Sequence, residues 1–263
     1  MNSRLRRTAP RTALPVLAAA LLVPLTAACG SGGGGSTEAG GGNSTLTVLA
    51  ASSLTDVFRT AGAAYEKEHP GTKVEFSFAG SQELAAQVRQ GAPADALVTA
   101  DSKTMDGLKG EVGKPTVIAE NRLTIATGKG NPKKVGALKD LARNDLKVVL
   151  AAPEVPVGRY SKQVLDDEGV QVHPVSQEPN VRAVLSKVEL GEADAGLVYV
   201  TDAATARDKV DTVTVPDGQN AVASYPAATL KDARNAAAAE SFVTWLSSAK
   251  AQKMLRDAGF QKP

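Results

Sequence analysis

Two serine-containing segments stand where an apolar run gives way to a helical pattern. Residues 46–50 lead into Ser52 and Ser53, and residues 74–78 lead through a glycine into Ser81. The start of a helix offers backbone N–H groups that no helical carbonyl accepts, together with the positive end of the helix dipole. A serine hydroxyl adds a further donor, so both junctions suit an anion, although serine at this place is also an ordinary helix cap.

Three further features repeat this chemistry. The apolar run 148–150 leads through residues 153–158 into a helical pattern, and Asn180 caps a helix that begins at Val181. Tyr199 ends another apolar run, where its hydroxyl would donate into the same crevice; the alternative is an aromatic side chain that completes a core strand. Enough converging donors can hold a dianion without any Lys or Arg.

Residues suited to catalysis are scarce. The two histidines, His69 and His173, each precede a proline in a loop-like segment. No G-x-S-x-G elbow surrounds a serine, and Gly128 with Lys129 lacks the upstream glycine of a phosphate-binding loop. No group of His, Cys, Asp and Glu has metal-ligand spacing. We therefore expect no catalytic residue, no cofactor and no direct metal ligand.

Short apolar runs alternate with segments of helical spacing along the chain. The runs are 46–50, 74–78, 96–99, 123–127, 147–150 and 195–199. This alternation predicts an α/β fold with mainly parallel sheets flanked by helices. Ligands on such sheets bind at the carboxyl ends of the strands, where the junctions described above lie.

The chain is expected to form two lobes. Glycine and proline punctuate residues 128–132, and the chain ends in an alanine-rich helical stretch, 231–258. We expect one lobe from residues 45–122 together with 223–263, and a second from residues 123–222. The chain would then cross twice between them.

The first 28 residues have the composition of an export signal. Four arginines precede the apolar run 13–25, which is shorter than the ~20 apolar residues of a spanning helix. Cys29 is the only cysteine, and residues 25–29 resemble a bacterial lipobox. We expect a signal peptide over 1–28, then a lipidated Cys29 and a flexible glycine-rich tether over 29–44. The alternative is ordinary signal cleavage beside an incidental cysteine.

The charge balance changes when the signal is removed. Basic residues fall from 30 to 26 against 28 acidic residues, so the formal net charge changes from +2 to −2. Lys and Arg are also interspersed with Asp and Glu, which leaves no basic block for nucleic acid. We expect no nucleic-acid partner and a place outside the cytoplasm, on the outer face of the cell membrane.

Seven segments resemble, in order and spacing, the molybdate-binding receptors of ABC importers. The resemblance extends from about residue 46 to residue 260. The segments are 47–55 (TVLAASSLT), 78–81 (FAGS), 91–95 (GAPAD), 100–101 (AD), 153–158 (PEVPVG), 181–182 (VR) and 196–203 (GLVYVTDA). The resemblance implies a type II periplasmic-binding-protein fold with the ligand in the cleft between its lobes. It also implies a monomeric lipoprotein that captures molybdate or tungstate for a permease driven by an ATPase.

In that family two serines, two backbone N–H groups and a tyrosine hydroxyl hold the oxyanion. Matched motif by motif, the serines fall on Ser53 and Ser81, the backbone donors on Val157 and Val181, and the hydroxyl on Tyr199. Molybdenum would be bound only as its oxyanion, through these residues. Val157 stands where many relatives have alanine, which leaves the backbone N–H in place.

Two other functions stay open. One is a receptor for sulfate or phosphate, which uses the same helix-end chemistry. A phosphate receptor generally needs an acceptor for the remaining proton; none of the five residues is a carboxylate, although Asp56 and Glu178 are near in sequence. The other is a surface lipoprotein without a transport role, which would account for the anchor but not for the junctions.

Overall fold

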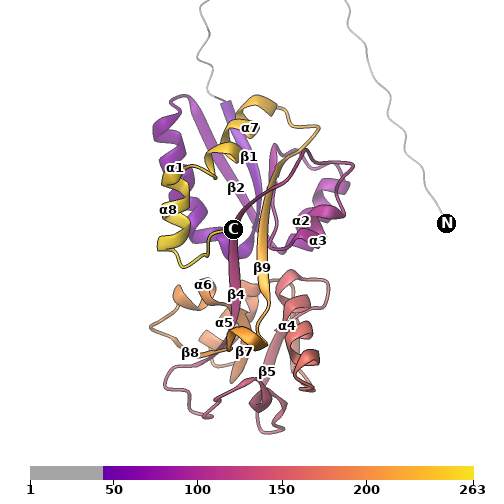
Figure 1. The fold of residues 1–263 in the computed structure, drawn as a ribbon, viewed down its shortest axis with the longest axis vertical. Helices are drawn as coiled ribbons and strands as arrows, with labels where there is room; N and C mark the ends of the chain where they lie inside the picture. Colours follow the sequence, from indigo (N-terminus) through magenta and orange to yellow (C-terminus); the bar gives the residue numbers. More distant parts are fainter. Residues whose placement is uncertain (1–43) are drawn as a thin grey trace, which may run out of the picture. The chain divides into compact units, whose positions relative to one another are not determined.

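A computed structural model describes residues 44–263 of this protein, and these residues form a nine-stranded sheet flanked by helices (Figure 1). The strands are β1 (Ser44–Ala51), β2 (Thr72–Ala79), β3 (Ala96–Val98), β4 (Thr116–Gly128), β5 (Val148–Ala151), β6 (Ser176–Glu178), β7 (Ala195–Tyr199), β8 (Val210–Thr214) and β9 (Val222–Thr229). The predicted signal peptide, Cys29 and the tether up to residue 43 lie outside the described residues.

The α-helices follow the strands in alternation, as the sequence predicts. They are α1 (Thr55–Glu68), α2 (Ser81–Arg89), α3 (Ser102–Asp106), α4 (Pro156–Asp167), α5 (Val181–Glu189), α6 (Val200–Ala204), α7 (Ala236–Trp245) and α8 (Ala249–Asp257). A turn of 3₁₀ helix, Ser52–Leu54, precedes α1. Over residues 44–263, no helix has both the length and the apolar character needed to cross a membrane.

Strand β4 changes its partners half-way along. Its residues 116–122 pair with β9, whereas residues 123–128 pair with β7 and β8. It therefore joins a first strand group, made of β1, β2, β3 and β9, to a second strand group, made of β5, β6, β7 and β8. Figure 1 shows β4 and β9 side by side between the two groups.

The predicted α/β fold is confirmed, but the pairing is more mixed than the sequence indicates. Strand β1 is parallel to β2 and β3, and β5 is parallel to β6 and β7. Every pair that involves β4 or β9 is antiparallel. The two strands that pass between the groups are therefore antiparallel to each other and to all of their other neighbours.

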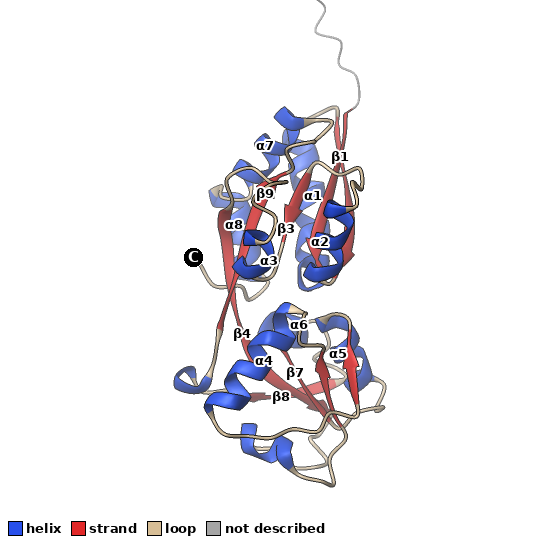
Figure 2. Ribbon diagram, turned by 90° about the vertical axis from the view of Figure 1, so that its right-hand side faces the viewer, coloured by secondary structure: helices blue, strands red, loops and turns tan. Residues whose placement is uncertain are grey.

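The largely apolar run in β1 is buried on both faces. Leu46, Val48 and Ala50 belong to a core shared with residues of α1, α7 and α8. Leu49 points the other way, into a smaller core shared with residues of α2 and α3. Figure 2 shows helices on both sides of the first strand group. Because side chains alternate along a strand, a run with apolar residues on both of its faces fits a sheet covered on both faces.

The sequence does not single out three of the strands. β6 and β8 are short and contain few apolar residues, and β9 contains alanine and proline, which disfavour strands. They form because they pair with neighbours that the apolar runs do predict.

The helical stretch expected over 231–258 is two helices. α7 ends at Trp245, and α8 begins after Ser248, whose hydroxyl accepts a hydrogen bond from Ala251 N at 3.2 Å. Ser248 is thus an ordinary N-cap inside an alanine-rich run.

Two arginines connect the strand groups across the gap between them. Arg159 on α4 donates to the carboxylate of Asp101, which precedes α3. Arg182 on α5 donates to Asp56 on α1, with 2.7 Å between Nη2 and Oδ2, and also to Asp202. The side chain of Asp101 is 4% exposed, whereas that of Asp56 is 57% exposed. The two crossing pairs therefore differ sharply in burial.

Gly158 allows α4 to start close to the end of β5. A Cβ atom at this position would lie 2.0 Å from the carbonyl oxygen of Ala152 and 2.7 Å from that of Ala151. Backbone atoms cannot move aside cheaply, so only glycine fits this close approach. The approach also fixes the position of Val157, the preceding residue.

We expect the Asp101→Asn substitution to lower the free energy of unfolding by about 1–3 kcal/mol, the usual cost of depriving a buried charged group of its partner. Asparagine keeps an oxygen for the cap at Thr104 N, which Asp101 Oδ1 accepts at 2.9 Å. The substitution therefore removes mainly the charge that faces Arg159. Urea denaturation measures the change.

The matched control is Asp56→Asn, which breaks the exposed crossing pair and should cost less than about 1 kcal/mol. If both substitutions lower the free energy of unfolding equally, the buried pair of Asp101 and Arg159 does not contribute more to stability than the exposed pair.

We expect Gly158→Ala to destabilise the fold, although alanine favours helices over glycine by up to about 1 kcal/mol. Overpacking against backbone carbonyls usually costs about 1–3 kcal/mol or more, so the clash should prevail. Gly110→Ala is the control, because a Cβ there meets no atom within 4 Å. Thermal unfolding of both variants tests this, and an unchanged melting temperature for Gly158→Ala would refute the tight contact.

Candidate functional site

One cavity is lined by all five residues that the sequence singles out as ligand-binding, Ser53, Ser81, Val157, Val181 and Tyr199. The space open to the centre of a water-sized sphere is about 10 Å³. A cavity needs roughly 10–15 Å³ of such space to hold one water, so this cavity is too small for an organic ligand.

Each element delivers its donor at an end that faces the cavity. Ser53 lies in the 3₁₀ turn after β1, and Ser81 is the first residue of α2. Val157 and Val181 lie in the first turns of α4 and α5. Backbone N–H groups in a first helical turn have no acceptor within their own helix. The sheet therefore gathers several helix starts around one small space.

The hydroxyls of both serines already accept or share a hydrogen bond within the protein. Ser81 Oγ accepts from Ala100 N at 3.0 Å, which leaves the hydroxyl proton of Ser81 free to donate. Ser53 Oγ lies 2.9 Å from the hydroxyl oxygen of Tyr225. Both serines are buried. Their remaining hydrogen-bonding capacity faces the cavity that they line.

Tyr199 brings a buried donor with no partner. Its side chain is 1% exposed, and its hydroxyl has no hydrogen-bond partner among residues 44–263. Burial raises the pKa of this hydroxyl well above its ordinary value, so it keeps its proton. An unpaired buried hydroxyl is costly, which points to an acceptor that completes the site.

No charged side chain lines the cavity in the described part of the chain. Arg159 and Arg182 stand close to it in sequence, on the first turns that carry Val157 and Val181. Both guanidinium groups are paired, that of Arg159 with Asp101 and that of Arg182 with Asp56 and Asp202. The cavity therefore presents neutral dipoles, which suit a dianion when enough of them converge.

Asp202, a buried residue of α6, forms an ion pair with Arg182. Burial raises the pKa of the Asp202 carboxyl to about 6, and the neighbouring Arg182 opposes that rise. Arg182 thus lies between a fully buried carboxylate and the exposed Asp56. Neither carboxylate lines the cavity, so neither can accept a proton from a ligand there.

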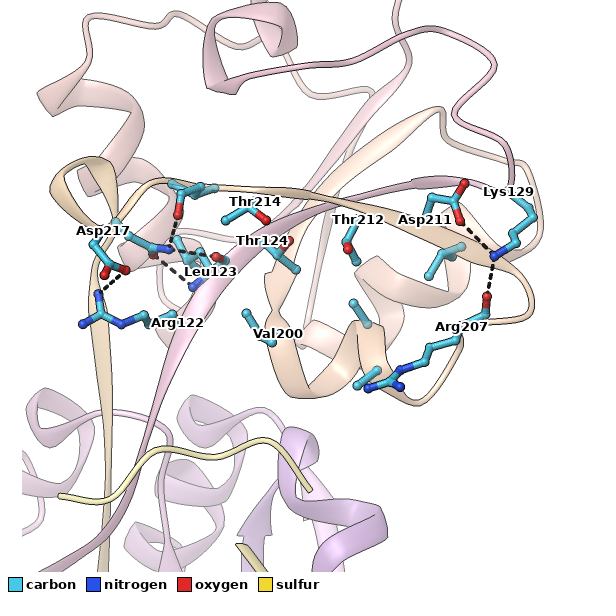
Figure 3. A pocket seen from close by; sticks show the side chains of 15 residues that line it. Arg122, Leu123, Thr124, Lys129, Val200, Arg207, Asp211, Thr212, Thr214 and Asp217 are labelled. Carbon is cyan, nitrogen blue, oxygen red and sulfur yellow. Dashed lines mark hydrogen bonds and ion pairs between the residues drawn. The ribbon is translucent and has the colours of Figure 1, made fainter. Parts of the chain in front are cut away.

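A larger cavity of about 470 Å³ lies elsewhere, between α6, β4 and β8 (Figure 3). Four of its charged residues form two pairs, Lys129 with Asp211 at 2.8 Å and Arg122 with Asp217 at 3.5 Å, whereas Arg207 has no ion pair within residues 44–263. The smaller cavity is the better candidate for the functional site, because buried donors from four helix starts line it and the Tyr199 hydroxyl has no partner within residues 44–263.

The histidines lie away from this cavity. His69 ends α1, where its ring stacks on Tyr65 with centroids 3.9 Å apart. His173 is exposed beside a different hollow. Over residues 44–263, no group of three or more His, Cys, Asp and Glu could hold a metal ion.

Three residues at or beside the cavity are not among the five predicted ligands. Ser52 and Asn180 line it; the sequence places them at the predicted helix starts without assigning them to the ligand. Tyr225 lies in β9, whose residues do not read as a strand, and its role depends on a contact with Ser53 at a separation of 172 residues. Only the three-dimensional arrangement reveals such a pair.

Comparison with known proteins places the chain in a family. Residues 46–261 match the family described as bacterial extracellular solute-binding protein. The molybdate-binding protein ModA of Mycobacterium tuberculosis (strain ATCC 25618 / H37Rv) is 40% identical over 252 residues, which are 94% of this chain and 97% of that protein. The resemblance indicated by the seven sequence segments is thus confirmed.

Solved structures share the fold. The periplasmic molybdate-binding protein of Azotobacter vinelandii has a TM-score of 0.73 at 24% identity, over 83% of this chain and 99% of that one. The sulfate-binding protein SubI of Mycobacterium tuberculosis H37Rv has a TM-score of 0.74 at 21% identity, over 83% and 87%. The predicted type II periplasmic-binding-protein fold is confirmed. Family match and fold agree over nearly all the described residues, and the chain belongs to the bacterial extracellular solute-binding proteins.

Proposed function

We propose that this protein captures molybdate outside the cytoplasm and delivers it to the permease of an ABC importer. The observation that supports this most strongly is one neutral cavity lined by Ser53, Ser81, Val157, Val181 and Tyr199, with the Tyr199 hydroxyl unpartnered. A 40% identical relative is named a molybdate-binding protein.

The proposed chemistry is saturation of a tetrahedral dianion by dipoles. Molybdate offers four oxygens that only accept hydrogen bonds. The two serines give hydroxyl and backbone donors, the two valines give backbone N–H groups, and Tyr199 gives its hydroxyl. No Lys or Arg is required, because helix starts carry partial positive charge. Tungstate has the same charge and almost the same size, so we expect it to bind as well.

We propose that the two strand groups act as lobes that close on the ion. One lobe would comprise residues 45–122 and 223–263, and the other residues 123–222. Ser53 and Ser81 belong to the first and would receive the ion, and the other three donors would close over it. Arg159 and Arg182 cross the gap beside the valine donors, which supports such closure.

Phosphate is the less suitable oxyanion for this site. Near neutral pH it retains a proton that needs an acceptor, and no carboxylate lines the cavity in the described residues. Asp56 is paired with Arg182, and Glu178 accepts from Ser176 Oγ at 2.7 Å. Sulfate carries no such proton, and discrimination against it would rest on the size of the cavity.

The binding role needs neither a catalytic residue nor a cofactor. The ligand itself would carry the metal, as the molybdate oxyanion, and no side chain would coordinate molybdenum directly. We propose that the protein acts as a monomer, whose partners are the permease and its ATPase.

We expect molybdate and tungstate to raise the melting temperature of the purified protein, with smaller effects of sulfate and none of phosphate, because a ligand of the folded state alone stabilises it. Tyr199→Phe should weaken molybdate binding by tenfold to a hundredfold, since a hydrogen bond to a charged group contributes about 1.5–3 kcal/mol. Thermal melting and titration calorimetry measure both effects.

Tyr65→Phe is the matched control, because it also removes a buried tyrosine hydroxyl, one that donates to Ser241 Oγ at 3.0 Å away from the cavity. Its affinity for molybdate should equal that of the wild type. Stabilisation by sulfate or phosphate with none by molybdate would exclude the proposed cargo.

We further propose that Cys29 anchors the protein to the membrane. The sequence supports a signal peptide over 1–28, a lipidated Cys29 and a glycine-rich tether up to residue 44. A flexible tether of about this length would reach roughly 20 Å, enough to hold the folded part just outside the membrane surface. Ser44, which we expected to end the tether, is instead the first residue of β1, so the tether would end at residue 43.

We expect Cys29→Ser to move the protein from the membrane fraction to the soluble fraction of cells, because serine offers no thiol for lipidation. Immunoblots of both fractions give the measurement, and Ser44→Ala serves as a control with the cysteine intact. A Cys29→Ser protein that stays with the membrane would disprove the lipid anchor.

A further inference from the structure

We propose that Tyr225 is a positioning residue that turns the hydroxyl proton of Ser53 toward the cavity. The inference rests on the proposed function, because it concerns the orientation of a proposed ligand. Tyr225 lies on β9 and is 0% exposed. Its oxygen is 2.9 Å from Ser53 Oγ, and it does not line the cavity.

The direction of this hydrogen bond follows from Asn121 on β4. The Nδ2 atom of Asn121 lies 3.4 Å from the Tyr225 oxygen and 2.8 Å from Thr201 Oγ1. An amide NH₂ group only donates, so the Tyr225 oxygen accepts from Asn121. Its own proton then needs an acceptor, and the only one within hydrogen-bonding distance among residues 44–263 is Ser53 Oγ.

The backbone fixes the orientation of the Asn121 amide. Asn121 Oδ1 accepts from the N–H of Arg122 at 3.0 Å. Turning the amide over would set its NH₂ group against this N–H, and two donors cannot form a hydrogen bond. Nitrogen and oxygen of an asparagine are assigned from such partners, and the Arg122 N–H can only donate.

Burial keeps the Tyr225 hydroxyl in its protonated form. Removal from solvent raises the pKa of this group, while the bonds to Ser53 and Asn121 oppose the rise. The hydroxyl therefore has one proton to give, and in the opposite direction that proton would be buried without an acceptor. Giving it to Ser53 satisfies both groups.

Ser53 is then committed as a donor to the cavity. One lone pair of its oxygen receives the Tyr225 proton, so its own proton is free for the ligand. Ser81 has the same arrangement, since its oxygen accepts from Ala100 N. In this arrangement the oxygen of each serine accepts one hydrogen bond from the protein. The donor is a backbone N–H for Ser81 and a tyrosine hydroxyl for Ser53.

This arrangement has a consequence for selectivity. A serine whose oxygen already accepts a hydrogen bond is a poor acceptor for the proton of hydrogen phosphate. Without Tyr225, Ser53 could rotate and either donate or accept. Tyr225 would thus favour fully deprotonated oxyanions at a site that it does not touch.

The test is a double-mutant cycle on the dissociation constant of sodium molybdate, measured by titration calorimetry on the whole protein. We expect Tyr225→Phe alone to weaken binding about threefold to tenfold, because Ser53 loses the bond that orients and polarises it. In a Ser53→Ala background, the same substitution should have no further effect. Phenylalanine fills nearly the same space, and Tyr65→Phe controls for loss of a buried hydroxyl elsewhere.

Two results would overturn the inference: an unchanged affinity for Tyr225→Phe, or an equal loss in both backgrounds, which indicates a merely structural role. If Ser53→Ala itself binds molybdate like the wild type, the proposed function loses its site, a different failure. As a second readout, the preference for molybdate over phosphate should fall in Tyr225→Phe, and an unchanged preference with weakened binding would also count against the orientation of Ser53.

Discussion

The proposed site depends on one constraint: a doubly charged ion would have to be held where no charged side chain of residues 44–263 lines the cavity. Dipoles can do this only if every donor proton points inward and none is lost to a neighbouring acceptor. The second-layer contacts meet this demand. Ala100 N donates to the oxygen of Ser81, Tyr225 donates to that of Ser53 in the direction that we propose, and Tyr199 has no competing partner within residues 44–263.

The topology of the sheet brings these donors together. Helix starts converge only where the strands that precede them end at a common edge, and parallel strands within each group provide that edge. The two groups must also face each other. β4 achieves this by pairing with β9 along its first half and with β7 and β8 along its second. The antiparallel pairing of the crossing strands thus serves the site, although each group on its own is arranged around parallel strands.

Local sequence predicts the parts of this arrangement that depend on local chemistry. Apolar runs identify strands such as β1 and β7, and cap residues locate helix starts such as Asn180 before α5. Both signals act over a few residues. β9 is different, because alanine and proline give it no strand pattern and only pairing with β3 and β4 forms it. Tyr225 lies on β9 and also lacks a local sequence signal. Its contact with Ser53 spans 172 residues, so no spacing in the sequence could identify it.

The arginines show why a neutral site is compatible with charge nearby. Arg159 and Arg182 occur in the same first turns as Val157 and Val181, so α4 and α5 bring a backbone donor and a cation together. A free guanidinium beside the ion would bind any anion strongly and with little regard to its protonation or shape. Pairing each arginine with an aspartate of the first strand group removes that attraction and links the two groups. In the proposed function, the paired charges would hold the two groups in position, and the neutral donors that line the cavity would recognise the ligand.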